Sequence, residues 1–273
     1  MSGAAADGLR MAGIAEHTLT ARANGREYVI KIALPADEPP ARGYPVLYAL
    51  DADATFLTMA EAVRLQTRRP HGYDPAVVVG IGYPSREPFD MTRRCYDFTM
   101  PAAGGTLPER PDGRPWPEHG GADLFLGFIE RELIPFVDGR FKTDPGRRTL
   151  YGHSLGGLLA LHAFFAGSAQ FAGYAAGSPS IWWGDYAVLR EMEAFAGRAD
   201  AGKRSRLLMM VGADELAHMV ADAVSLHNRL GGLRQVDSAW TAELVRFADE
   251  EHVSVLPAAI SRSIRFALAA TAD

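Results

Sequence analysis

The 273-residue sequence contains one cysteine, Cys95, no strong excess of either charge and no long apolar run. A single cysteine excludes a disulfide within the chain and a zinc site built from cysteines. The formal net charge of −5 and the absence of a basic cluster argue against a general nucleic-acid-binding surface. No stretch of about 18 apolar residues is available to span a bilayer, and residues 1–13 lack the pattern of a secretory signal peptide. We therefore expect a cytoplasmic protein with a loose tail over residues 1–13 and with neither nucleic-acid nor membrane partners.

The sequence contains instead a regular alternation of short apolar runs and helical segments. Runs typical of strands buried on both faces of a sheet occupy residues 45–50, 76–81, 147–151, 171–177, 206–211 and 240–247. Helical patterns occupy residues 60–67, 124–137, 155–165, 186–196, 217–230 and 254–270. This alternation predicts a single α/β domain over residues 1–273, with a mostly parallel central sheet and helices on both faces.

Two segments depart from the alternation. Residues 17–21 and 27–32 are rich in strand-forming residues and flank Asn24-Gly25, which predicts an antiparallel hairpin with a type I′ turn. Residues 84–122 contain seven prolines and two Gly-Gly pairs. A long irregular insertion in a compact domain is usually a lid or a binding loop, although an insertion without function is the alternative.

The segment Gly152-His153-Ser154-Leu155-Gly156 reads Gly-x-Ser-x-Gly, between a predicted strand and a predicted helix. A strand, a sharp turn and a helix form a nucleophile elbow, in which the serine hydroxyl is exposed at the edge of the sheet. An ordinary Gly/Ser turn would show the same five residues. The flanking strand and helix favour the elbow, and we predict that Ser154 is a catalytic nucleophile.

A serine hydroxyl needs a base to accept its proton, and the base is usually a histidine. In this fold the catalytic residues follow the chain order serine, acid, histidine. His252 is the histidine that stands between the last predicted strand and the last predicted helix, so we predict it as the base. The acid should follow the strand at residues 206–211, where Asp214 and Glu215 are equal candidates by position. Either of the two could instead begin the next helix.

An oxyanion hole needs two N–H donors directed at the oxygen that gains charge. One donor is the backbone N–H of the residue after the nucleophile, which is Leu155. The second comes from the loop after the strand at residues 45–50. We predict the backbone N–H of Asp53, with that of Ala52 as the alternative. The acids of this loop could also be simple turn-forming residues.

Several longer segments carry a resemblance to a known family. They are residues 44–51, 79–83, 94–99 (Arg-Cys-Tyr-Asp-Phe-Thr), 125–135, 152–157, 178–183 (Ser-Pro-Ser-Ile-Trp-Trp) and 251–257. From residue 45 to residue 268 the chain resembles the putative-esterase family of α/β-hydrolases, which includes esterases of catecholate siderophore trilactones. S-formylglutathione hydrolases and mycolyltransferases are more remotely similar. The resemblance implies an α/β-hydrolase fold and a serine esterase that forms an acyl-enzyme and needs neither a metal nor another cofactor.

The resemblance also bears on single residues. Ser154 and His252 match the family's nucleophile and base, and the family pattern Gly-x-x-Glu falls on Gly212 to Glu215, which favours Glu215 as the acid. Some siderophore esterases use a Ser-His pair without a well-placed acid. The family usually has Asp-Gly after the third strand, whereas this chain has Ala52 at the second position.

Two further residues are candidates for substrate contacts. Arg94 could bind an anionic substrate such as a ferric catecholate through charge-assisted hydrogen bonds, or it could form a structural salt bridge. Trp183, next to Trp182, could line the acyl pocket or pack in the core. The resemblance implies a small-molecule ester substrate, with a ferric catecholate siderophore as the favoured candidate. A general carboxylesterase, an S-formylglutathione-type thioesterase and a non-catalytic binding protein on the same fold are the alternatives.

Overall fold

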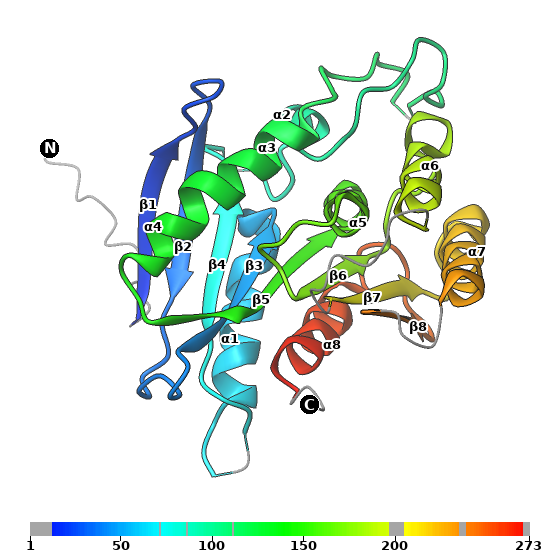
Figure 1. The fold of residues 1–273 in the computed structure, drawn as a ribbon. Helices are drawn as coiled ribbons and strands as arrows, with labels where there is room; N and C mark the ends of the chain where they lie inside the picture. Colours follow the sequence, from blue (N-terminus) through cyan, green and yellow to red (C-terminus); the bar gives the residue numbers. More distant parts are fainter. Residues whose placement is uncertain are drawn as a thin grey trace, which may run out of the picture.

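One eight-stranded sheet runs through the protein in the order β1-β2-β4-β3-β5-β6-β7-β8 (Figure 1). The structure is a computed structural model that describes residues 13–70, 72–85, 87–110, 112–196, 205–234 and 239–269. The strands are β1 (Ile14–Thr20), β2 (Glu27–Ala33), β3 (Tyr44–Leu50), β4 (Val77–Gly82), β5 (Thr143–His153), β6 (Gly173–Gly177), β7 (Ser205–Gly212) and β8 (Trp240–Phe247). The six strands from β4 to β8 are parallel, whereas β1 and β2 are antiparallel to their neighbours.

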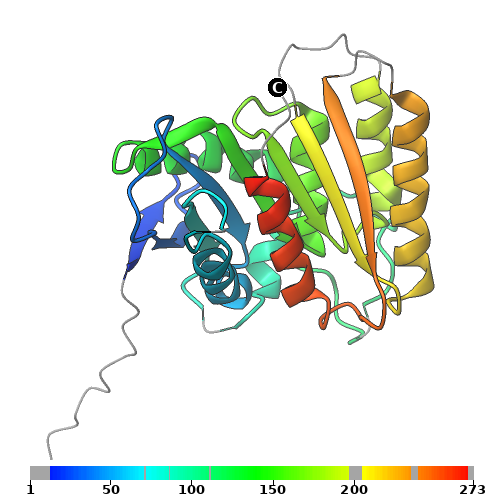
Figure 2. The ribbon, with the colours of Figure 1, turned by 90° about the horizontal axis from the view of Figure 1, so that it is seen from below.

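Helices cover both faces of the sheet, as the alternating pattern predicts. They are α1 (Ala52–Gln66), α2 (Met91–Asp97), α3 (Ala122–Phe128), the π-helical turn Ile129–Leu133, α4 (Ile134–Asp138), α5 (Leu155–Ala166), α6 (Trp183–Ala196), α7 (Ala217–Leu233) and α8 (Leu256–Leu268). Helices α1 and α8 pack together on one face, while α5, α6 and α7 lie on the other (Figure 2).

Strand β3 shows how the core is divided between these two layers. Successive strand side chains point to opposite faces of a sheet. Val46, Tyr48 and Leu50 therefore belong to the core under α5, whereas Leu47 and Ala49 belong to the core under α1 and α8. All five side chains are completely buried, which explains why the strand is apolar throughout.

The structure corrects two details of the predicted elements. Helix α1 begins at Ala52, directly after β3, and not near residue 60. Six residues connect β1 to β2, and of Asn24 and Gly25 only Gly25 has a positive φ, so the type I′ prediction is wrong. A wider loop forms instead, in which the N–H of Ala21 donates to the carbonyl of Arg26 and the N–H of Gly25 donates to that of Ala21.

Other predicted features are found as expected or lie outside the described ranges. The expected helix at 124–137 is a continuous helical segment from residue 122 to 138, interrupted only by the π-helical turn. Residues 1–12 of the predicted tail are outside the described residues. In the described part of the chain, no helix combines the length and apolarity needed to cross a membrane.

Candidate active site

Ser154 stands at the sharp turn between β5 and α5. Its backbone has φ 59° and ψ −116°, a conformation that costs free energy in a non-glycine residue and that commonly marks a functional site. A Cβ atom at Gly152 would lie 2.2 Å from the carbonyl oxygen of Gly156, so only glycine fits there. The Ser154 hydroxyl lies 3.4 Å from the hydroxyl of Ser180, which follows β6. The local geometry is therefore that of the predicted elbow.

His252 and Glu215 meet in the loops that follow two neighbouring strands, β8 and β7. Nδ1 of His252 lies 2.8 Å from Oε2 of Glu215. The other carboxylate oxygen of Glu215 accepts hydrogen bonds from the N–H of Gly212, at 2.7 Å, and from the hydroxyl of Ser178. The Glu215 side chain is completely buried, whereas that of His252 is 36% exposed. Of the two acids that the sequence left open by position, Glu215 contacts the histidine and Asp214 is exposed.

Glu215 is held in its ionised form by these contacts. Burial alone would raise the pKa of this carboxyl group, but hydrogen bonds from His252, Ser178 and Gly212 together lower it below its ordinary value. A carboxylate bonded to Nδ1 favours the imidazole tautomer that carries its proton on Nδ1. The second ring nitrogen, Nε2, is then free to accept a proton.

The parallel strands bring these groups to one edge of the sheet. Ser154, Glu215 and His252 follow the carboxyl ends of β5, β7 and β8. The ring of His252 lies 4.7 Å, between centroids, from the ring of His153, which directly precedes the serine. No hydrogen bond joins Ser154 Oγ to His252 among the described residues, and such bonds often tighten only when substrate is bound.

Two helices begin next to each other at the same edge. Leu155 is the first residue of α5, and Ala52 and Asp53 are the first two residues of α1. The first N–H groups of a helix have no acceptor within the helix, so all three are available to an external oxygen. A Cβ atom at Gly156 would lie 3.6 Å from Oδ2 of Asp51, which shows how closely the two helix starts approach.

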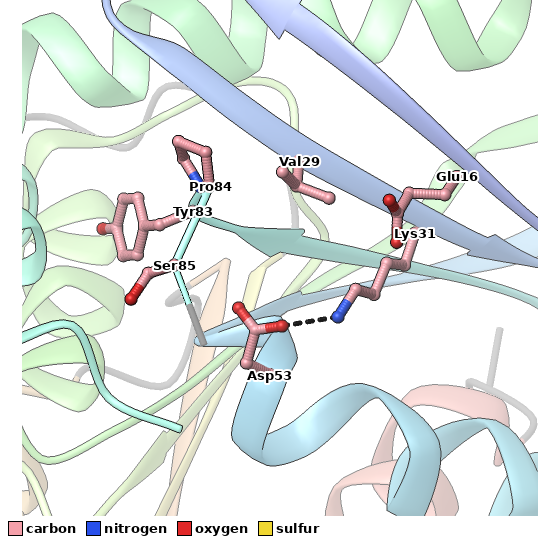
Figure 3. A pocket seen from close by; sticks show the side chains of 7 residues that line it. All are labelled: Glu16, Val29, Lys31, Asp53, Tyr83, Pro84 and Ser85. Carbon is pink, nitrogen blue, oxygen red and sulfur yellow. Dashed lines mark hydrogen bonds and ion pairs between the residues drawn. The ribbon is translucent and has the colours of Figure 1, made fainter. Parts of the chain in front are cut away.

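The side chain of Asp53 points away from this junction. It forms an ion pair with Lys31 of β2, at a cavity of about 410 Å³ that Tyr83 and Ser85 also line (Figure 3). The ion pair fastens the first turn of α1 to the antiparallel part of the sheet. The carboxylate of Asp53 is thereby occupied, while its backbone N–H remains a candidate donor.

Arg94, expected as a substrate contact, has structural contacts instead. From α2 it donates to both carboxylate oxygens of Asp51, at 3.1 and 3.0 Å, and to the carbonyl of His153 at 3.1 Å. The side chains of Arg94 and Asp51 are only 6% and 1% exposed. The guanidinium therefore connects the insertion to the loop after β3 and to the elbow, and its charge is already paired.

Trp183 is likewise a packing residue in the structure. Its side chain is completely buried, and its indole N–H donates to the carbonyl of Met100 at 3.0 Å. The rings of Trp116 and His119, both from the insertion, contact Trp183 edge-on. A substrate has no access to a fully buried indole. Trp182, its half-buried neighbour, contacts Trp116 at 5.9 Å between centroids.

Sequence reasoning assigned no role to four residues that surround the site: Asp51, His153, Ser178 and Ser180. Ser178 and Ser180 stand in the Ser-Pro-Ser-Ile-Trp-Trp segment after β6. Their position at the carboxyl end of a parallel strand was the available signal, because ligands of α/β sheets bind at that edge. Which group each hydroxyl contacts depends on the approach of β5 and β7, which no local pattern shows.

A strained serine between a parallel strand and a helix, on a sheet of this order, defines the protein as an α/β-hydrolase. The model of the family described as "Putative esterase" matches residues 21–253. The chain belongs to this family and is an ester hydrolase.

Individual relatives agree with this assignment. "Ferri-bacillibactin esterase BesA" of Bacillus subtilis (strain 168) is 42% identical over 273 residues, covering 98% of this chain and 93% of the relative. "Siderophore triacetylfusarinine C esterase" of Aspergillus fumigatus is 33% identical and covers 88% of each chain. The crystal structure of the BES protein from Bacillus cereus has a TM-score of 0.88 at 37% identity, covering 96% of this chain and 98% of that one.

Proposed function

We propose that the protein is a serine esterase that hydrolyses the ester bonds of a siderophore, with a ferric catecholate trilactone as the favoured substrate. The contact between His252 and Glu215 at 2.8 Å, on the same sheet edge as the Ser154 elbow, carries the serine mechanism. The names of the two relatives, which specify ferri-bacillibactin and triacetylfusarinine C, support a siderophore ester. The cytoplasmic location remains a prediction.

In the first half of the reaction, Nε2 of His252 accepts the proton of the Ser154 hydroxyl as its oxygen attacks the ester carbonyl carbon. Glu215 keeps the imidazole oriented and stabilises its positive charge. The carbonyl oxygen becomes an oxyanion and accepts hydrogen bonds from the N–H groups of Leu155 and Asp53, with Ala52 as the alternative second donor. The C–O bond then breaks, and His252 returns the proton to the leaving alcohol.

In the second half, a water molecule takes the place of the alcohol. His252 removes a proton from the water, whose oxygen attacks the acyl carbon bound to Ser154. The tetrahedral intermediate collapses, the serine recovers its proton, and the carboxylic acid leaves. Each lactone bond of a trilactone can be opened by the same cycle.

The insertion at residues 84–122 is the proposed binding loop. Trp116 and His119 pack on Trp183 at the start of α6, and Arg94 connects α2 to the loop after β3. The insertion is thus held beside the catalytic edge at two points. The half-buried rings of Trp116 and Trp182, and not the buried Trp183, are the aromatic surfaces that an aromatic substrate could reach.

Two measurements on the full chain test the proposal. A fluorophosphonate probe should modify Ser154, identified by peptide mass spectrometry, and Ser154→Ala should abolish both the labelling and the hydrolysis of p-nitrophenyl acetate. Ferric bacillibactin, ferric enterobactin and ferric triacetylfusarinine C should be opened by one water per ester, detected as the mass of the products. A Ser154→Ala variant with undiminished hydrolysis would reject the serine mechanism. Turnover of p-nitrophenyl acetate without turnover of any siderophore would reject the substrate while leaving the esterase mechanism intact.

A further inference from the structure

His153 is a buried polar residue for which the proposed mechanism has no use. It is the last residue of β5, directly before Ser154, and it is 2% exposed. Its main-chain carbonyl accepts a hydrogen bond from Arg94. Within the described residues, neither Nδ1 nor Nε2 of its ring forms a hydrogen bond of good geometry.

Two unpaired nitrogens in the core destabilise the folded state. A buried polar group without a well-formed hydrogen bond lowers the free energy of unfolding, whereas an apolar group of the same shape carries no such penalty. A phenylalanine would therefore fill the position of His153 with a gain in stability. A buried unsatisfied group in a native protein calls for an explanation.

The contacts of the ring indicate what it does. One side of it lies against β6, where a Cβ atom at Gly177 would be 3.2 Å from Nδ1 of His153. The other side lies against His252, with the two ring planes inclined by 44° and the centroids 4.7 Å apart. The imidazole of His153 is thus a wedge between β6 and the ring of His252.

The wedge stays uncharged while His252 changes its charge. Burial, followed by the nearby His252 and Arg94, lowers the pKa of His153 to about 3. The ring can therefore neither repel a protonated His252 nor compete with it for the serine proton. Contact with the main chain of His252 opposes this lowering, and the neutral ring of His153 presents a dipole directly beside the positive charge. Such a dipole acts strongly in a dry site.

We propose that His153 is a positioning residue for His252, whose neutral imidazole supports the histidine in its protonated state at the expense of folding stability. This inference rests on the proposed roles of Ser154 and His252. A phenylalanine can supply the shape of the wedge but not its dipole. The catalytic and the stability effects of replacing His153 are therefore expected to rank differently.

The test is the series wild type, His153→Phe and His153→Ala, assayed with p-nitrophenyl acetate and by urea unfolding. We expect kcat to decrease in the order wild type, Phe, Ala, with KM little changed. The Ala variant should lose about 100-fold, the effect of a catalytic group displaced by about 1 Å. The His153→Phe variant should be at least as stable toward urea as the wild type, and the His153→Ala variant should be less stable than both. A Phe variant with wild-type kcat would overturn the proposal, since packing alone would then explain the residue.

A coupling experiment keeps the proposal testable if the Ala variant folds poorly. Gly177→Ala should press on the wedge and lower kcat, and because the added methyl meets the ring at position 153 directly, its effect and that of His153→Phe should be non-additive. Strict additivity would contradict a wedge between β6 and His252. Fluorophosphonate labelling of wild-type Ser154 separates the two failures: an unlabelled serine removes the proposed function, while a labelled serine with an uncoupled His153 removes only this inference.

Discussion

Glu215 and His252, 37 positions apart in the sequence, are joined by a hydrogen bond of 2.8 Å between a fully buried carboxylate and a part-exposed imidazole. The bond is possible because β7 and β8 are parallel neighbours, with Gly212 beside Phe247 at their carboxyl ends. The N–H of Gly212 and the hydroxyl of Ser178 hold the carboxylate from its other side. The histidine is therefore oriented by a carboxylate that two further hydrogen bonds hold in place.

The first prediction concerns this carboxylate. Glu215→Gln keeps the shape of the side chain but removes the charge that stabilises the protonated imidazole, so kcat for p-nitrophenyl acetate should fall by at least about 100-fold. Asp214→Asn is the matched control, because its side chain is exposed and, among the described residues, Glu215 is the acid that pairs with His252. A larger loss in the Asp214 variant would move the acid role to Asp214.

The second prediction concerns the buried ion pair of Arg94 and Asp51. Arg94→Met leaves the Asp51 carboxylate in the core without its cation, and breaking a buried pair in this way costs about 3–5 kcal/mol of unfolding free energy. The double variant Arg94→Met with Asp51→Asn should recover a large part of that loss, measured by urea denaturation. If the single and double variants were equally unstable, the charge of Asp51 would not be the cause.

The third prediction concerns Asp97, a fully buried carboxyl group at the end of α2. Burial raises its pKa to about 6, above the value near 4 of an unfolded chain. The folded state then binds the extra proton, so this group makes the protein less stable as the pH rises from about 4 to about 6. The shift of two pKa units corresponds to about 3 kcal/mol.

Asp97→Asn should remove the loss of folding stability that accompanies the rise in pH. The variant should be more stable than the wild type at pH 7, and the difference should shrink toward pH 4, as measured by unfolding at several pH values. The carboxamide can still accept the hydrogen bond that Tyr28 donates to Asp97. A difference independent of pH would show that Asp97 does not titrate in this range.

The fourth prediction concerns His162 of α5, which lies between Glu191 of α6 and Asp123 of α3. Its Nδ1 is 2.8 Å from Glu191 and its Nε2 is 3.1 Å from Asp123. Burial alone would lower the pKa of His162, but the two carboxylates outweigh it and raise the pKa above its ordinary value. A raised pKa means that the histidine stabilises the fold fully below pH 6.5 and that this contribution disappears as the pH rises through the folded-state pKa.

His162→Gln should therefore destabilise the protein more at pH 5.5 than at pH 9. Thermal unfolding at both pH values measures the difference, and His227→Gln on α7, a histidine without such a pair of acidic contacts among the described residues, serves as the control. An equal loss at both pH values would indicate that His162 acts through neutral hydrogen bonds alone.

The sequence predicted the secondary-structure elements more accurately than the contacts between side chains. The six predicted parallel strands and the elbow follow from apolar runs and from Gly-x-Ser-x-Gly, which are local patterns, and the structure confirms the mostly parallel sheet. The type I′ turn and the late start of α1 were wrong. In both cases backbone hydrogen bonds at the junction, from Ala21 to Arg26 and from Ala54 to Asp51, decide the local conformation.

Arg94 and Trp183 show why substrate contacts were harder to predict. Both belong to segments that mark the family, and both were candidates for substrate contacts, with a salt bridge and core packing as the alternatives. Their burial depends on the way the insertion packs against the loop after β3 and the start of α6. An arginine can bind an anionic substrate only if no buried acid already pairs with it. The position of Asp51 relative to α2, which decides this, is a property of the folded chain.

The sequence by itself determined the α/β architecture, the serine turn and the place of His252 after the last strand, because side-chain periodicity and glycine spacing act within a few residues. The tertiary structure placed Glu215, which the family resemblance had favoured over Asp214, against His252, paired Arg94 with Asp51 and set His153 against His252. Adjacent residues such as Asp214 and Glu215 are neighbours in the sequence, but their side chains point in different directions. Only the packing of β5, β6, β7 and β8 determines which side chain faces the catalytic edge of the sheet.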